Sequence, residues 1–174
     1  WYSKAAENNY VPAMLAAGFL EEKYQHNYMR SKDWYTKAAQ QDNPMAKYNL
    51  GLMYDYGKGV KVDVNKAITL YNQASKENVL PAKINLANLY YKDKDNNEML
   101  EKSIYWLKQA SNDNDANSNY KLAKMYEVGL GMPININKAK QHYQVATKLG
   151  NIDAHISLGR LHQSKTISDH SSIQ

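Results

Sequence analysis

Small and apolar residues recur at helical spacing along this chain. One stretch consists of Ala46, Leu50, Gly51, Met53 and Tyr54. These offsets place all five side chains on one face of an α-helix. A second stretch, with spacings of three to four residues, consists of Ala67, Leu70, Tyr71 and Ala74. The pattern therefore predicts two consecutive helices, which we name helix A (from 46) and helix B (from 67).

This pair of helices recurs with a period of 36 residues. The leucine position of helix A reads Leu50, Leu86, Leu122 and Leu158. The next position reads Gly51, Ala87, Ala123 and Gly159, and the aromatic position reads Tyr54, Tyr90, Tyr126 and His162. The string WYTKAA at Trp34 repeats WYSKAA at Trp1 after only 33 residues, so the first full unit is three residues shorter. We therefore expect the chain to start inside a helix B and to be a piece of a longer protein.

A repeated hairpin of two helices cannot bury both of its faces alone, so successive hairpins stack on one another. We expect an all-α fold, an α-α solenoid that forms a right-handed superhelix of about four to five hairpin repeats of 36 residues. The expected units are about 1–12 (partial), 13–44, 45–80, 81–116, 117–152 and 153–163 (partial), followed by a flexible, Ser-containing tail at 164–174.

Residues at the predicted helix ends agree with these boundaries. The expected starts of helix A carry Pro12, Pro44 and Pro81, at a position that tolerates a missing amide donor. The expected N-caps of helix B are Asn27, Asp63 and Asn135. The loop from helix A to helix B contains Gly57 and Gly59 in one unit and Gly129 and Gly131 in another, whereas the third unit has KDKDNNE from Lys92.

The residues from Ala46 to Ala74 follow the pattern A-x-x-x-L-G-x-x-Y-x-x-G-x-G-V-x-x-D-x-x-K-A-x-x-x-Y-x-x-A. This pattern resembles the Sel-one-like repeat, a relative of the tetratricopeptide repeat. The fourth unit departs from it at Ala123, Met132 and Asn135, and the third unit lacks both loop glycines. The resemblance implies a non-catalytic adaptor, typical of bacteria, that holds a protein partner in the concave groove lined by helix A. It favours the periplasm or secretion over the cytoplasm without fixing the compartment.

Polar residues follow two rows of helix A that would face this groove. The position before the repeat leucine reads Asn49, Asn85, Lys121 and Ser157, and the position two after it reads Leu52, Asn88, Lys124 and Arg160. Amide side chains hydrogen-bond a peptide backbone, while Lys and Arg hold acidic groups. We expect partner-binding residues at Asn49, Asn85, Asn88, Tyr91, Lys92, Tyr120, Lys121, Lys124 and Arg160. The alternative is that exposed helix positions are polar without any binding role.

The charge of the chain is concentrated near one end. The net charge is +5, and residues 118–165 hold seven Lys and Arg against two Asp and Glu. A basic region of this kind attracts acidic partners. Nucleic-acid binding is disfavoured because the cations are scattered and no reading module is recognisable.

The sequence supports other functions less well. An immunity or inhibitor protein that occludes a toxin would use the same surface, and a hydrolase of a cell-wall-like substrate is a further alternative. No nucleophile with a base is visible, and we predict neither an enzyme nor a cofactor. A zinc site of His142, His155 and His162 is conceivable on spacing, but two of these residues occupy packing positions of the repeat. No apolar run approaches the roughly 18 residues of a membrane helix.

Overall fold

A computed structural model describes the backbone of residues 2–171 and the side chains of residues 4–163. Helices make up all its regular structure, so the predicted all-α class is confirmed for the described part of the chain. The helices are α1 (Tyr2–Glu7), α2 (Val11–Lys23), α3 (Tyr28–Gln40), α4 (Pro44–Tyr56), α5 (Val64–Lys76), α6 (Leu80–Tyr91), α7 (Asn97–Asn112), α8 (Ala116–Val128), α9 (Ile136–Lys148) and α10 (Ile152–Ser171).

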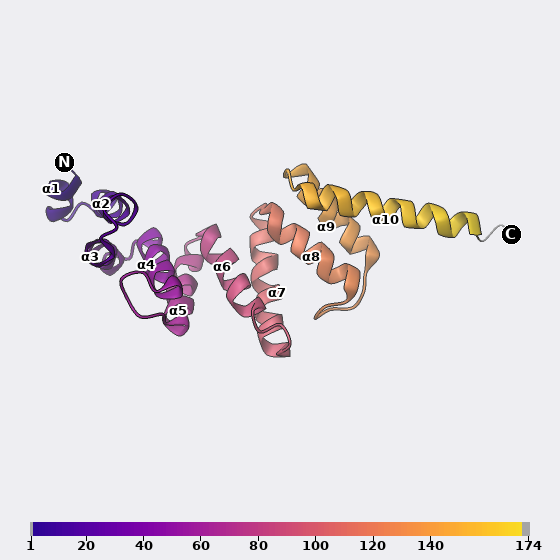
Figure 1. Ribbon diagram of the computed structural model, residues 1–174, viewed down its shortest axis with the longest axis horizontal. Coiled ribbons are helices and arrows are strands. Elements are labelled where there is room, and N and C mark those ends of the chain that lie inside the picture. Colours follow the sequence, from indigo (N-terminus) through magenta and orange to yellow (C-terminus); the bar gives the residue numbers. More distant parts are fainter. Residues whose placement is uncertain (1, 172–174) are drawn as a thin grey trace. The chain divides into compact units, whose positions relative to one another are not determined.

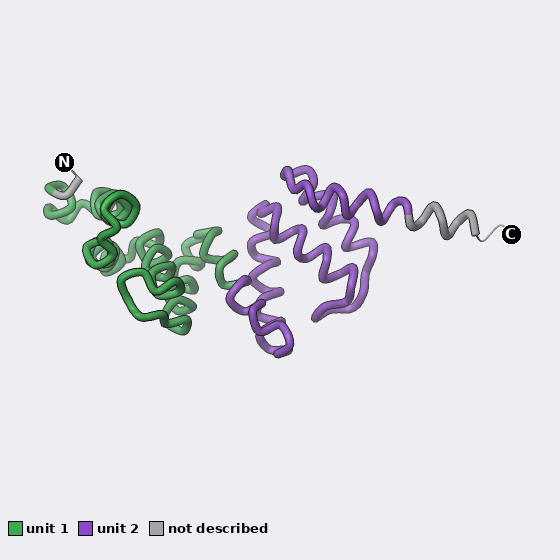
Figure 2. Tube along the Cα trace, in the orientation of Figure 1, with its two compact units in different colours: residues 1–86 green, residues 87–174 purple. Residues whose placement is uncertain are grey.

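The helices alternate between the two types that the periodicity predicts. Helices of type A are α2, α4, α6, α8 and α10, and helices of type B are α1, α3, α5, α7 and α9. Helix α2 packs on α3, α4 on α5 and α8 on α9, each pair forming a hairpin that can be followed along the ribbon in Figure 1. The chain divides into two compact units, Trp1–Leu86 and Ala87–Gln174, which Figure 2 colours separately. The predicted tail at 164–174 lies outside the residues whose side chains are described.

Side-chain caps fix the start of each helix B where the sequence predicted them. Asn27, Asp63 and Asn135 each accept a hydrogen bond from the backbone N–H three residues later. Gly57 and Gly129 end α4 and α8 in the left-handed conformation, with φ of 70° and 75°. Because a residue with a side chain is strained at such φ values, this conformation explains why glycine occupies both positions.

A second repeated signal marks the turn from each helix B to the next helix A. Positive φ angles occur at Asn9, Asp42, Asn78, Asn114 and Gly150, and the last four of these are spaced by the repeat period. Asn, Asp and Gly are the residues that adopt this conformation most readily. The sequence contained this turn signal, but the predicted boundaries did not use it.

The small residues of helix A allow close contact with helix B. A Cβ atom on Gly51 would lie 2.6 Å from the ring of Tyr71, and one on Gly18 would lie 2.5 Å from the ring of Tyr35. Tyr71 and Tyr35 are almost fully buried, as are the repeat residues Ala46 and Leu50. In these two hairpins the glycine of helix A therefore leaves the room that the ring of the helix-B tyrosine occupies.

The aromatic residue near the end of helix A is half-buried, and a lysine ammonium lies over its ring. Lysine ammonium groups lie over the rings of Tyr54, Tyr90 and Tyr126 at 4.2, 5.7 and 5.3 Å from the ring centroids. These cations belong to Lys66, Lys102 and Lys138, one per repeat at the start of helix B. In the first hairpin a buried Glu21 stands at the aromatic position, and Arg30 at the lysine position pairs with it at 3.3 Å. Cation–π contact thus explains the lysine of the repeat pattern.

Candidate functional site

The predicted partner-binding residues are distributed over both units. Asn49 lies on α4 and Asn85 on the part of α6 that belongs to the first unit. The second unit contains the other seven: Asn88, Tyr91, Lys92, Tyr120, Lys121, Lys124 and Arg160. Direct contacts among predicted residues are found in the second unit, between α6 and α8 and within α8.

Lys121 and Asn88 form one of these contacts. The Lys121 ammonium donates a hydrogen bond to Asn88 Oδ1 at 2.5 Å, joining α8 to α6. Partial loss of hydration lowers the pKa of the Lys121 ammonium, and the negative charge of Asp115 opposes this effect. Because the oxygen of Asn88 accepts from Lys121, its amide NH₂ group is oriented to donate. The pair therefore presents a cation and an oriented amide donor at one surface point.

Lys124 and Tyr120 form the neighbouring contact on α8. The Lys124 ammonium lies 5.6 Å from the centroid of the Tyr120 ring, and the side chain of Lys124 is exposed. Tyr120 is half-buried because its ring packs on that of Tyr143, with centroids 5.9 Å apart. Tyr120 therefore supports helix packing as well as the position of Lys124.

Arg160 is engaged within the protein. Its guanidinium forms an ion pair with Glu127 Oε1, and Glu127 Oε2 accepts a hydrogen bond from Tyr143 Oη at 2.6 Å. The Glu127 side chain is 16% exposed and that of Arg160 is 65% exposed. A carboxylate already compensates the charge of Arg160, so this residue offers less attraction to an acidic partner than its place in the row suggested.

Tyr91 and Lys92 stand at the exposed end of α6. Tyr91 is 38% exposed and has the Lys94 ammonium 6.0 Å from its ring centroid. In the first unit, burial raises the pKa values of the Tyr48 and Tyr71 phenols, and the nearby side chain of Asn85 opposes this rise. Asn85 therefore has an internal role that the sequence did not show.

A tyrosine of helix B pairs with a carboxylate of helix A in more than one hairpin, and the repeat pattern did not predict this pairing. Tyr71 Oη donates to Asp55 Oδ2 at 3.3 Å, and Tyr143 donates to Glu127 at the equivalent position. In the first hairpin, burial and then the charge of Glu22 raise the pKa of the Tyr35 phenol to about 12.

The third unit shows the signal that would have revealed these pairs. The position of the carboxylate is occupied there by Tyr91, and the position of the helix-B tyrosine by Leu107. Both partners are thus absent together, as expected for groups that satisfy each other's hydrogen bonds.

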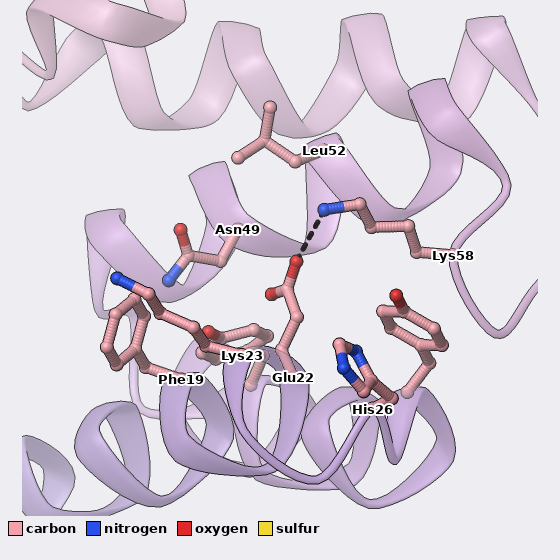
Figure 3. A pocket seen from close by; sticks show the side chains of 9 residues that line it. Phe19, Glu22, Lys23, His26, Asn49, Leu52 and Lys58 are labelled. Carbon is pink, nitrogen blue, oxygen red and sulfur yellow. Dashed lines mark hydrogen bonds and ion pairs between the residues drawn. The ribbon is translucent and has the colours of Figure 1, made fainter.

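A pocket of about 360 Å³ opens in the first unit. Helix α2 contributes Phe19, Glu22 and Lys23 to it, and α4 contributes Asn49 and Leu52. The remaining lining residues are His26, Tyr28, Tyr35 and Lys58. Figure 3 shows Glu22 and Lys58 meeting between these walls, where their ion pair spans 2.6 Å. Asn49 is the one predicted binding residue in this lining.

His142 has a packing role in the second unit. Its ring stacks on Tyr126 with centroids 5.6 Å apart, and its Nδ1 lies 3.0 Å from Asn119 Oδ1. Burial lowers the pKa of the imidazole, and the charges of Lys138 and Lys108 lower it further. Within the described residues, no group of three His, Cys, Asp or Glu side chains could hold a metal ion.

Two comparisons with known structures bear on the fold. The chain is similar to a Sel1 repeat protein from Oxalobacter formigenes, with 27% identity and a TM-score of 0.77, covering 87% of this chain and 63% of that one. It is also similar to immunity protein Pa5087 from Pseudomonas aeruginosa, with 26% identity and a TM-score of 0.53, covering 88% of this chain and 58% of that one. The helical solenoid of these repeat proteins is therefore the fold of this chain.

A curated relative matches over a shorter stretch. It is an ERAD-associated E3 ubiquitin-protein ligase component, HRD3B, from Arabidopsis thaliana, 37% identical over 67 residues. The match covers 38% of this chain and 11% of the relative, so the chain corresponds to a small part of that protein.

None of the described helices is long and apolar enough to cross a membrane.

The family comparison covers most of the chain. A model described as the Sel1 repeat matches residues 1–10, 13–43, 44–79, 81–115 and 116–151. Sel1 repeat proteins generally mediate protein–protein interaction. The predicted resemblance is confirmed: this chain belongs to the Sel1 repeat family.

Proposed function

We propose that this protein is a non-catalytic interaction scaffold that binds an acidic segment of a protein partner on α6 and α8. The contact of Lys121 with Asn88 is the observation that carries this proposal. It places a cation beside an oriented amide donor, which are the two groups needed for an acidic side chain and a peptide backbone.

The surroundings of this contact support an anionic ligand. Lys124 is exposed on the same helix, and it has a ring contact with Tyr120 rather than an ion pair among the described residues. Arg160 is paired with Glu127 and takes a secondary role in the proposal. The excess of basic residues between 118 and 165 attracts acidic partners over longer distances, and salt weakens this attraction.

Fluorescence anisotropy with a labelled peptide of alternating Glu and Ala tests the proposal. A matched peptide of alternating Gln and Ala serves as the neutral probe. We expect saturable binding of the acidic peptide alone, with affinity that decreases as salt increases. The double variant Lys121→Glu, Lys124→Glu should abolish this binding, because two attractive charges become repulsive. The control Lys148→Glu changes an exposed residue in the last turn of α9. It should retain binding, with only a small loss of long-range electrostatic attraction.

Two results would contradict the proposal. One is acidic-peptide binding that survives the double substitution in α8. The other is equal binding of the neutral peptide, which would show that charge does not determine recognition. Circular dichroism of each variant establishes that the helices are retained.

A second candidate function rests on the similarity to immunity protein Pa5087. In that case the bound partner is a toxin, and binding abolishes the toxin's activity. Co-expression with a captured partner distinguishes the two functions, since a scaffold leaves the partner active while an immunity protein restores the growth of cells that produce it.

A further inference from the structure

The pocket in the first unit lies apart in sequence from the α8 residues of the proposed function. Its volume of about 360 Å³ is at the lower end of the range of roughly 300 to 1,000 Å³ that holds small ligands. A pocket of this size accommodates one or two residues of a peptide. Phe19 is 48% exposed there, so an apolar surface is open to a ligand.

Three polar side chains of the pocket lack internal polar partners. Among the residues whose side chains are described, Lys23 contacts the rings of Phe19 and Tyr24 but forms no ion pair. The side chains of Asn49 and His26 form no hydrogen bond within the same part of the chain. In Figure 3, Lys23 and Asn49 lie on one side of the pocket and His26 on the other.

The charges of the pocket favour an anionic ligand. Its carboxylate, Glu22, already binds Lys58 at 2.6 Å, and this hydrogen bond raises the pKa of the Lys58 ammonium. Tyr35 also interacts with Glu22. Glu22 is therefore satisfied, while Lys23 has no carboxylate partner among the side chains that the structure describes. A cation entering the pocket would compete with Lys58 for Glu22. An anion, in contrast, could accept hydrogen bonds from Lys23 and Asn49.

We propose that this pocket binds a carboxylate of a partner peptide together with an adjacent apolar side chain. Lys23 and Asn49 hold the carboxylate, and Phe19 and Leu52 contact the apolar side chain. The proposal rests on the proposed function in that the ligand belongs to a protein partner, but it uses different residues. The carboxylate comes either from an acidic side chain or from a chain terminus, and the two sources share this chemistry.

Nuclear magnetic resonance titration of the full chain tests the proposal with three small probes. N-acetyl-glycyl-leucine supplies a terminal carboxylate, and N-acetyl-leucyl-aspartic acid α-amide supplies a side-chain carboxylate. N-acetyl-glycyl-leucinamide is the neutral control. We expect one or both carboxylate probes to shift the side-chain amide of Asn49 saturably, with a dissociation constant in about the millimolar range for ligands of this size.

Two matched variants separate the pocket from general charge effects. Lys23→Gln should weaken binding about fivefold or more, the loss expected for one charge-assisted hydrogen bond. Lys76→Gln removes an exposed charge elsewhere in the first unit and should leave the affinity within about twofold. Binding of one carboxylate probe alone supports the proposal and identifies the source of the carboxylate.

Three outcomes would overturn the proposal. They are equal binding of the neutral probe, no shift of pocket resonances up to about 20 mM of any probe, and an unchanged affinity in Lys23→Gln. If the small carboxylate probes do not bind in the pocket but the acidic peptide still binds to α8, the pocket proposal is rejected and the proposed function is retained. The reverse result rejects the α8 surface instead.

Discussion

Two glycines at equivalent repeat positions should respond oppositely to the same substitution. Gly51 on α4 and Gly159 on α10 both follow the repeat leucine of a helix A. Gly51 lies against Tyr71, whereas a Cβ atom on Gly159 would meet no atom of the described residues within 4 Å, apart from its chain neighbours and the backbone of its own helix. Replacing each by Ala therefore adds the same methyl group to a crowded site in one case and to open space in the other.

The magnitudes follow from two opposing terms. Glycine inside a helix is less favourable than alanine by about 0.5–1 kcal/mol, so both substitutions gain this amount. At position 51 the new Cβ would lie 2.6 and 2.7 Å from two ring atoms of the fully buried Tyr71. Overpacking of this kind costs about 1–3 kcal/mol. We expect Gly51→Ala to destabilise the protein by about 0.5–2 kcal/mol and Gly159→Ala to stabilise α10 by about 0.5–1 kcal/mol.

Urea unfolding and amide hydrogen exchange measure the two effects. Trp34 reports on the first unit and Trp106 on the second, so fluorescence detects unfolding in both units. Repeat proteins open locally, and exchange of the α10 amides is the sensitive measure for Gly159→Ala.

Either of two results would refute this reasoning. Stabilisation by Gly51→Ala would show that helix propensity outweighs the contact with Tyr71. Destabilisation by Gly159→Ala would show that another group covers that face of α10. Ala123 and Tyr143, at the equivalent positions of the fourth unit, belong to one buried cluster, so a methyl group is accommodated where the two helices are positioned for it.

Three further perturbations test contacts of the second unit. The folded protein lowers the pKa of His142 from its ordinary value of about 6.5. Below pH 6.5 the unfolded chain therefore binds more protons at this residue than the folded protein does. Stability should be constant above that pH and decrease as the pH falls through it, and thermal unfolding of His142→Leu should show less of this decrease. Tyr143→Phe removes the hydrogen bond to Glu127 and should lower the free energy of unfolding by about 1–2 kcal/mol in urea titrations; an unchanged midpoint would contradict the pairing. Asn135→Ala removes the cap that accepts from the N–H of Lys138, and should cost about 1 kcal/mol and increase hydrogen exchange at the start of α9.

Contacts within one repeat were accessible from the sequence. The repeat pattern placed the small residue Gly51 on the apolar face of helix A, and Gly51 lies against Tyr71 of helix B. The caps at Asn27 and Asp63 were likewise recognised from residue type and position. These features depend on neighbours within one hairpin or one turn, so residue spacing is sufficient to identify them.

The candidate site was only partly accessible for the opposite reason. The two rows identified Lys121, Lys124 and Arg160 as surface cations, and Lys124 and Arg160 occupy equivalent positions of the repeat. In the structure Lys121 binds Asn88, Lys124 lies over a ring, and Arg160 pairs with a carboxylate. Long side chains at equivalent backbone positions thus have different partners, which depend on the residues that other helices bring within reach.

The sequence by itself determined the repeat, the alternation of two helix types, their caps and the small residues at their contacts. These properties follow from local backbone preferences and from the period of the apolar positions. Only the tertiary structure decided that Glu22 pairs with Lys58 in a pocket, where Lys23 has no carboxylate partner within the described part of the chain. Such pairing depends on distances between side chains far apart in sequence, and these distances are set by how the helices pack.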